Sequence, residues 1–182
     1  MPTSRLADVP RAFGWLSAYY KEVSKLCDRI RSEVEQHPNG YECLSGTGID
    51  WATSKVITRP LQWFPTYHYQ FFARPIEEGG KRRALLAICI QHFIDGKNDD
   101  PIVYLVRFEG GVDDVYSEKK GAIVYAWDIT GDEEERDGWR LGSSQELQYA
   151  YRCIPLDLID SLDAVRPTLI DPLVEFDRAQ GA

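Results

Sequence analysis

The sequence has little of what usually marks a small enzyme or a metalloprotein. It holds three histidines, four cysteines without a C-x-x-C pair, and no Gly-x-Ser-x-Gly nucleophile elbow. No apolar run approaches the ~20 residues that span a bilayer, and the first residues contain no apolar core of signal-peptide length. These absences predict a soluble protein without a membrane segment, and the unpaired cysteines favour a reducing, cytoplasmic compartment.

The cysteines are weak candidates for nucleophilic catalysis. Cys89 falls in an apolar strand segment, and Cys153 follows Arg152, whose side chain points to the other face of a strand. A cysteine in apolar surroundings has a raised pKa and is inert. Cys27 and Cys43 also lie in segments expected to be helix or strand, where a free cysteine packs as a small hydrophobe.

Other catalytic templates are missing as well. The pairs Gly79-Gly80 and Gly110-Gly111 do not lie between a strand and a helix, so neither forms a phosphate-binding turn. The triplet Glu118-x-Lys120 falls in a charged loop, where so short a pattern recurs by chance. We therefore assign no catalytic residue and expect no cofactor.

Charge is distributed unevenly along the chain. The net charge is −8, and residues 121–182 hold the excess, with five basic and thirteen acidic residues. This part lacks the clustered Lys and Arg that bind phosphates, which argues against direct nucleic-acid binding. An acidic surface either keeps a protein soluble or engages a basic protein partner. A nucleic-acid mimic is a further alternative, although −8 is modest for that role.

A long helix is predicted for residues 9–36. Its apolar residues alternate in spacing between three and four, which places them on one stripe. They are Phe13, Leu16, Tyr20, Val23, Cys27, Ile30 and Val34. Asp8 is a suitable N-cap, and Pro10 is tolerated in the first turn. The helix is expected to end before the Pro-Asn-Gly sequence at 38–40.

Between residues 41 and 154 the period changes from helical to strand-like. Six segments qualify as strands: Tyr41–Ser45, Tyr67–Ala73, Ala84–Ile94, Ile102–Phe108, Ala122–Ile129 and Leu147–Ile154. A seventh, Lys55–Thr58, has a weaker pattern. Short turns such as Glu78–Lys81 predict an antiparallel meander. Since Ala84–Ile94 is apolar at both its odd and its even positions, both faces are expected to be covered, and we expect it to be a central strand.

An acidic segment follows these strands. Thr130–Gln145 is longer than a hairpin requires and is predicted to be a loop. Trp139 in this loop either anchors a protein partner or tucks back and pins the loop. The predicted partner-binding residues are Glu133, Glu134, Glu135 and Trp139.

The end of the chain, residues 155–182, is predicted to be helical with breaks at Pro167 and Pro172. Asp171 is a suitable cap before Pro172. The apolar residues expected to face the body of the domain are Leu173, Val174 and Phe176.

The most biased stretch is Trp63–Phe72, in which six of ten residues are aromatic. Alternation along a strand divides it into an apolar ladder (Tyr67, Tyr69, Phe71) and a mixed face (His68, Gln70, Phe72). We expect the ladder to pack in the core, under the long helix. The mixed face is then either solvated or part of a ligand-binding surface, which would be formed by His68, Gln70, Phe72 and His92.

His68 and His92 lie on strands expected to be neighbours, so the two imidazoles can meet across the pair. Cys89 and His92 are three apart on a strand and point to opposite faces, so they cannot share a metal ion. Two histidines without a third ligand are typical of hydrogen-bonded structural residues, and we expect no metal site.

The sequence thus predicts one α+β domain over residues 1–182, with a mainly antiparallel sheet of about five to six strands, a long N-terminal helix and C-terminal helices. The leading hypothesis is a non-catalytic binding or regulatory protein whose acidic C-terminal third and exposed aromatic residues engage a protein partner. The alternative is a small-molecule-binding domain or an enzyme that uses the sheet face around His68, Gln70 and His92. A deep pocket lined by those three residues would favour the alternative.

Overall fold

The computed structural model describes residues 8–44, 50–51, 67–74, 84–92, 100–109, 134–144 and 147–180. Its helices are α1 (Val9–Glu35) and α4 (Asp171–Gln180), joined by the short helical turns η3 (Leu156–Leu158), η4 (Leu162–Ala164) and η5 (Arg166–Ile170). Its strands are β1 (Glu42–Cys43), β2 (Asp50–Trp51), β3 (Tyr67–Ala73), β4 (Ala84–Gln91), β5 (Ile102–Glu109), β6 (Glu134–Arg136), β7 (Trp139–Ser144) and β8 (Leu147–Pro155).

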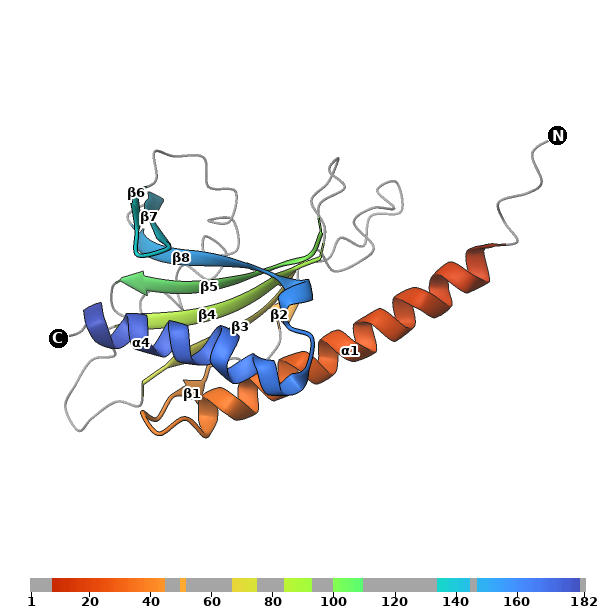
Figure 1. The fold of residues 1–182 in the computed structure, drawn as a ribbon, viewed down its shortest axis with the longest axis horizontal. Helices are drawn as coiled ribbons and strands as arrows, with labels where there is room; N and C mark the ends of the chain where they lie inside the picture. The colour runs from red at the N-terminus through yellow and green to blue at the C-terminus, as the bar shows by residue number, and fades with distance from the viewer. Residues whose placement is uncertain are drawn as a thin grey trace.

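The described strands form one antiparallel sheet, which confirms the predicted α+β class (Figure 1). Their order is β1-β3-β4-β5-β8-β7-β6, and β2 also pairs with β3. The eight strands exceed the predicted five to six because β2, β6 and β7 were not predicted, whereas β1 lies within the predicted Tyr41–Ser45. β2 and β6 are only two or three residues long and carry no periodic pattern that a sequence can reveal, and β7 lies in the segment predicted to be a loop.

The long strands follow the sequence pattern closely. β3 occupies the predicted Tyr67–Ala73, and β4 ends at Gln91 instead of Ile94. β4 lies between β3 and β5 and is buried on both faces, which confirms its expected central position. The segments Lys55–Thr58 and Ala122–Ile129 and the turn Glu78–Lys81 lie outside the described residues.

The sheet separates two apolar clusters. α1 and α4 cover one face, as Figure 1 shows, and pack on residues such as Phe72 and Leu105. The second cluster contains Tyr69 and Phe71 on the opposite face. The ladder residues Tyr69 and Phe71 are therefore in the core, as predicted, but they face away from α1, and the mixed face lies beneath the helix instead. The polar mixed face tolerates this burial because Gln70 Nε2 donates to the backbone oxygen of Cys27 at 3.0 Å.

α1 matches the predicted helix, but only its second half packs on the sheet. The stripe is buried from Val23 to Val34, whereas Phe13 keeps 60% of its surface exposed. Figure 1 shows the first half of α1 projecting past the end of the sheet. Asp8 occupies the N-cap position without a side-chain capping hydrogen bond. None of the described helices is both long and apolar enough to cross a membrane.

The predicted loop Thr130–Gln145 contains a β-hairpin, which corrects that prediction. β6 and β7 pair antiparallel, with Arg136 opposite Trp139. The two residues between them, Asp137 and Gly138, have φ values of 54° and 76°. Positive φ at both central positions is the signature of a tight two-residue hairpin turn, for which Asp-Gly is a preferred sequence.

The C-terminal helix also differs from its prediction. Asp171 has helical backbone angles and is not a non-helical cap, so η5 runs directly into α4. The Asp171 amide donates to the Arg166 carbonyl, five residues earlier. This wider turn lies where Pro172, which has no amide hydrogen, would interrupt a regular helix. Leu173 and Val174 face the core as predicted.

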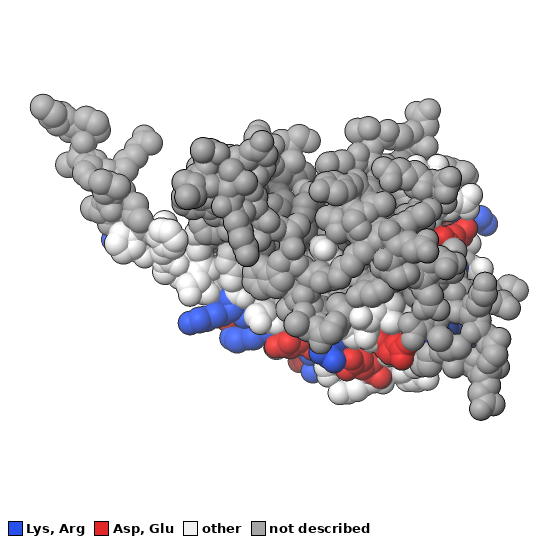
Figure 2. Space-filling view, turned by 180° about the vertical axis from the view of Figure 1, so that it is seen from behind, with Lys and Arg blue, Asp and Glu red and all other residues white. Residues whose placement is uncertain are grey.

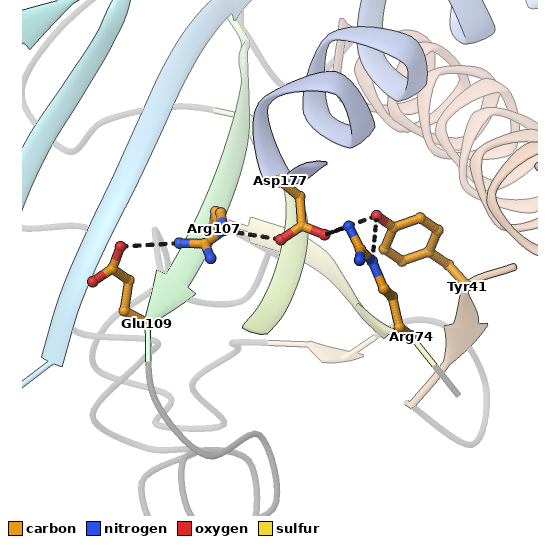
Figure 3. A network of polar contacts seen from close by, with 5 residues as sticks. All are labelled: Tyr41, Arg74, Arg107, Glu109 and Asp177. Atoms are coloured by element: carbon orange, nitrogen blue, oxygen red, sulfur yellow. Dashed lines mark hydrogen bonds and ion pairs between the residues drawn. The ribbon is translucent and has the colours of Figure 1, made fainter. Parts of the chain in front are cut away.

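A buried polar network ties α4 to the sheet (Figure 3). Asp177 on α4 is 4% exposed and accepts hydrogen bonds from Arg107 Nε at 2.9 Å, from Arg74 Nη2 at 2.9 Å and from the Tyr41 hydroxyl at 2.8 Å. Arg107 also contacts the half-exposed Glu109 at 3.0 Å. Burial raises the pKa of Tyr41 to about 12, so this hydroxyl remains a donor. The network lies at the end of β3 opposite His68.

Candidate functional site

The strongest concentration of functional side chains lies where α1 leaves the sheet. His68, near the start of β3, and His92, just after β4, meet there beneath the helix. Their ring centroids are 4.7 Å apart with planes at 80°, and His68 Nδ1 contacts His92 Nε2. Their positions follow from the β3–β4 register, which pairs His68 with Ile90 and thus makes His92 its diagonal neighbour.

Two tyrosines of α1 cover this histidine pair. The Tyr19 hydroxyl lies 2.6 Å from His92 Nδ1. The Tyr20 ring lies 5.4 Å from the His92 ring and 6.0 Å from the His68 ring. Because Tyr19 and Tyr20 are adjacent in a helix, they approach the pair from two sides and fix how α1 sits on this end of the sheet.

Tyr19, His92 and His68 form a continuous hydrogen-bonded chain, which we call the relay. Both ring nitrogens of His92 are engaged, and a neutral imidazole has one donor and one acceptor. Either Tyr19 donates to His92 and His92 donates to His68, or all the donors reverse direction. The relay thus has two neutral arrangements, which differ in the position of the protons on its nitrogen and oxygen atoms. Its Tyr19 end is half-buried, near the surface.

Burial keeps the relay uncharged at neutral pH. Desolvation lowers the pKa of His68 from its ordinary 6.5 to about 4. Desolvation, together with the neighbouring His68, lowers the pKa of His92 to about 3. Desolvation likewise raises the pKa of Tyr19 above its ordinary 10. Neutral imidazoles are the form that binds metals, but the described segments hold no group of three or more His, Cys, Asp or Glu that could form a complete site.

The relay continues outward into an exposed aromatic surface. The Trp15 ring stacks on Tyr19 with centroids 5.7 Å apart and planes at 8°. Trp15 is 66% exposed and Phe13 is 60% exposed. We call residues 10–20 of α1 the arm, and eight of these eleven residues are exposed. In Figure 2 the described part of this projection is mostly white, whereas the coloured charged side chains gather along one edge of the body.

The other residues of the predicted ligand site are covered. Phe72 is fully buried in the helix-covered cluster. Gln70 is held against the backbone of α1 by its bond to Cys27. The structure therefore brings His68 and His92 together but places Gln70 and Phe72 inside the core, away from any open surface.

The predicted partner-binding residues lie on or beside the β6–β7 hairpin. Of the two roles considered for Trp139, the structure favours pinning, because its ring stacks on Phe176 at 4.0 Å and is 4% exposed. Glu134 and Glu135 lie on β6, the last of the described strands in the sheet order, where Glu135 is exposed. Charges on an edge strand discourage pairing with other chains. Glu133 lies outside the described residues.

A pocket of about 350 Å³ opens between α4, β7 and β8. Its lining includes Glu109, Tyr149, Phe176 and Gln180. His68, Gln70 and His92 do not line it, so this pocket does not provide the concavity that would favour the predicted ligand site.

Sequence reasoning missed the tyrosines and the exposed arm. The signal was present, since residues 13–20 contain Phe13, Trp15, Tyr19 and Tyr20. The stripe pattern assigned Phe13 and Tyr20 to the buried face, and only the length of the sheet shows that the arm extends past it. No family model, curated protein or solved structure matches the chain, so the site rests on its own geometry.

Proposed function

We propose that this is a non-catalytic binding protein that engages a protein partner through the arm. The observation that carries the proposal is the exposure of Phe13 and Trp15 on a helix that projects beyond its own sheet. Trp139, the aromatic residue predicted to bind a partner, is buried, so the proposal uses Phe13 and Trp15 of α1 instead. Aromatic side chains of this size are common energetic centres of protein interfaces.

The arm has the properties of a surface that another molecule covers. Fully burying one large apolar side chain is worth about 1.5–3 kcal/mol, so leaving two exposed is unfavourable. Most helical stability in proteins comes from tertiary packing, and residues 10–15 of the arm are all exposed. Docking of a partner would bury the aromatic rings and stabilise the helix at the same time.

The acidic part of the chain supplies long-range attraction in this proposal. Glu134 and Glu135 belong to a C-terminal third with a large acidic excess, and a partner with a basic region would be steered toward it. We place this interaction in the cytoplasm, where free thiols such as the buried Cys27 and Cys89 remain reduced.

Affinity capture at low salt tests the proposal. Immobilised protein is compared with the variant F13S/W15S, and captured proteins are purified and re-tested individually in solution. We expect at least a tenfold loss of affinity in the variant, because hot-spot aromatic residues typically contribute ~2 kcal/mol or more. Charge reversal at Glu134 and Glu135 should weaken binding at low salt and have little effect at high salt.

The matched control is L158S/L162S, which removes two exposed apolar residues from η3 and η4, outside the arm. It should bind like the unchanged protein. Equal binding by F13S/W15S and the unchanged protein would refute docking through the arm.

The relay favours a second candidate function, small-molecule binding or acid–base chemistry at Tyr19, His92 and His68. It is motivated by the continuous hydrogen bonds from the half-buried Tyr19 to the buried His68. Thermal-shift screening against metabolites tests this candidate. A hit whose stabilisation disappears in His92→Gln would support it, and uniformly null shifts would count against it.

A further inference from the structure

We propose that the partner of the arm is a second copy of this chain, and that two arms pair antiparallel about a twofold axis. This inference rests on the proposed docking through the arm and names its occupant. A second copy is itself acidic, with a net charge of −8, so the attraction of a basic partner is not part of self-pairing. The surface in question is the apolar arc of the arm, formed by Ala12, Phe13, Trp15 and Leu16.

The charges of α1 favour self-pairing. Arg11 is the one charged residue in the arm, whereas residues 21–35 carry eight charged side chains. Several of those later charges pair with each other along α1, as in Lys25–Glu22 at 2.7 Å and Arg29–Glu33 at 2.7 Å. A nearly uncharged surface is complemented by another uncharged surface, and an identical arm meets that requirement without leaving a charge buried and unpaired.

The arc is also a continuation of an interface that is already packed. The residues that α1 uses to pack on the sheet, from Val23 to Val34, share one helical face with Leu16 and Phe13. The same spacing of three and four that packs on the sheet therefore continues past its end. Such a stripe suits packing against another helix, because ridges of one helix fit into the grooves of the next.

Antiparallel pairing follows from where the bodies lie. Each arm meets its body where Tyr19 and Tyr20 contact His92. Figure 1 shows the first half of α1 projecting away from the sheet. Parallel arms would bring both bodies to the same end. Antiparallel arms put one body at each end and place Phe13 of one copy near Leu16 of the other. Closed twofold pairs of this kind are the commonest form of homo-oligomer.

The area available predicts a weak dimer. The eleven arm residues span roughly 16 Å of helix. From side-chain areas of about 150–250 Å², the exposed parts of Phe13 and Trp15 offer roughly 250 Å² in each copy. With Ala12 and the half-buried Leu16, which add roughly 100–150 Å² in each copy, a pair buries at most about 800 Å², in the range of weak and transient contacts. We therefore expect a dissociation constant of roughly 1–100 µM.

Sedimentation equilibrium of the full chain between roughly 1 and 200 µM spans the expected range of affinities and tests the proposal. We expect a monomer–dimer equilibrium in the unchanged protein and in L158S/L162S, and a dissociation constant raised at least tenfold in F13S/W15S. Circular dichroism of each variant checks that the body is folded, which is expected because all four substituted side chains are exposed. A monomer throughout this range, or a dimer that F13S/W15S leaves unchanged, would overturn the proposal.

A spin label at Lys21→Cys, with the exposed Cys153 and partly exposed Cys43 replaced by Ser, tests the orientation. In the antiparallel arrangement, the two copies of residue 21 lie on opposite sides of the twofold axis, thirteen residues apart along the helix direction. At 1.5 Å per residue, this places the two labels roughly 20–30 Å apart. Parallel arms would place them within about 15 Å, given interhelical distances of 8–10 Å, and would contradict the antiparallel arrangement.

The same variants separate failure of this inference from failure of the proposed function. A monomer whose arm binds a different purified protein would overturn self-pairing but support docking through the arm. A monomer whose arm binds vesicles of mixed neutral and anionic phospholipids would replace the second copy with a lipid surface and overturn both. A monomer with no arm-dependent binding would also overturn both.

Discussion

Asp177 is the residue on which the polar contacts of the helix-covered core converge. It receives hydrogen bonds from Arg107, Arg74 and Tyr41, which lie on or next to three different strands. Asp177 and Arg107 are both buried, so neither charge has water as a substitute partner. Removing Asp177 leaves the buried Arg107 with the half-exposed Glu109 as its remaining charged partner, and breaking a buried pair in this way costs far more than the pair itself contributes.

We expect Asp177→Ala to lower the free energy of unfolding by about 3–5 kcal/mol, because Arg107 would lose its buried counter-ion. Urea denaturation followed by far-ultraviolet circular dichroism measures the change. The control Glu109→Ala removes the half-exposed partner of the same arginine and should cost less than about 1 kcal/mol. Similar losses in both variants would show that burial of the Asp177 charge is unimportant.

His68 and His92 link the stability of the fold to pH. Their pKa values in the folded protein, about 4 and about 3, lie below the ordinary 6.5 of an unfolded histidine. Between these values the unfolded chain binds more protons than the folded one, so acidification favours unfolding. The stability that the neutral histidines contribute to the folded state is complete above about pH 6.5, and it is lost as the pH falls toward 3.

The double variant His68→Gln/His92→Gln should therefore show a shallower loss of stability between pH 6.5 and pH 4 than the unchanged protein. Urea midpoints at several pH values give the two slopes, and the slopes matter more than the absolute stability, which the lost hydrogen bonds also change. Parallel curves over this window would mean that the histidines are not buried in neutral form.

At the scale of elements, the hairpin β6–β7 and the strand β8 depend on one close approach. A Cβ atom added at Gly142 on β7 would lie 2.5 Å from the Tyr149 hydroxyl oxygen and 2.7 Å from Cζ. These two residues are opposite each other in the β7–β8 register, so the tyrosine ring occupies the space that other residues would need. A glycine in a strand interior often marks such an approach.

Gly142→Ala should destabilise the protein by about 1–3 kcal/mol, because the Tyr149 ring must move in a packed region. Gly14→Ala is the matched change in open space, since a Cβ there meets nothing within 4 Å. It should stabilise the arm helix by up to about 1 kcal/mol. Thermal unfolding of both variants measures the difference, and effects of the same sign would contradict this account of Gly142.

The elements differ in how far the sequence predicts them. β3 and β4 are found almost residue for residue, because strict alternation and a continuous apolar run are local signals. The hairpin at Asp137-Gly138 carries an equally local signal, but its acidic surroundings suggested a loop. Which face of β3 meets α1 is not local at all, and depends on how Gln70 is accommodated beneath the helix.

The contacts of the candidate site also differ in how far the sequence predicts them. Contact between His68 and His92 follows from the adjacency of two strands and is predictable. The contact between Tyr19 and His92 joins residues 73 positions apart on different elements. No spacing in the sequence encodes it, and the Asp177 network is hidden for the same reason.

For the molecule as a whole, the central feature is the contrast between the two halves of α1. The second half completes the core. The first half leaves the sheet at the tyrosine–histidine cluster and carries Phe13 and Trp15 into solvent. We interpret the cluster as the support of the arm and the arm as the surface on which another protein docks. Loss of that support should leave the body folded and weaken docking.

Tyr19→Phe tests this relation, because it removes the hydroxyl that bonds His92 but retains the ring that stacks on Trp15. We expect a loss of about 0.5–1.5 kcal/mol in stability, as for other single hydrogen bonds, and a measurable weakening of self-association by sedimentation. Unaltered self-association would show that the arm does not depend on the relay.

Hydrogen exchange of the amides in residues 10–20, followed by mass spectrometry over a range of protein concentrations, tests the central claim most directly. If the arm is a docking surface for a second copy, its exchange is fast in dilute protein and slows as the concentration rises, and exchange in residues 23–34 does not change. Fast exchange in the arm at every concentration would contradict self-pairing. Slow exchange already in dilute protein would show that the arm helix is stable without a second copy, and would contradict the claim that pairing stabilises it.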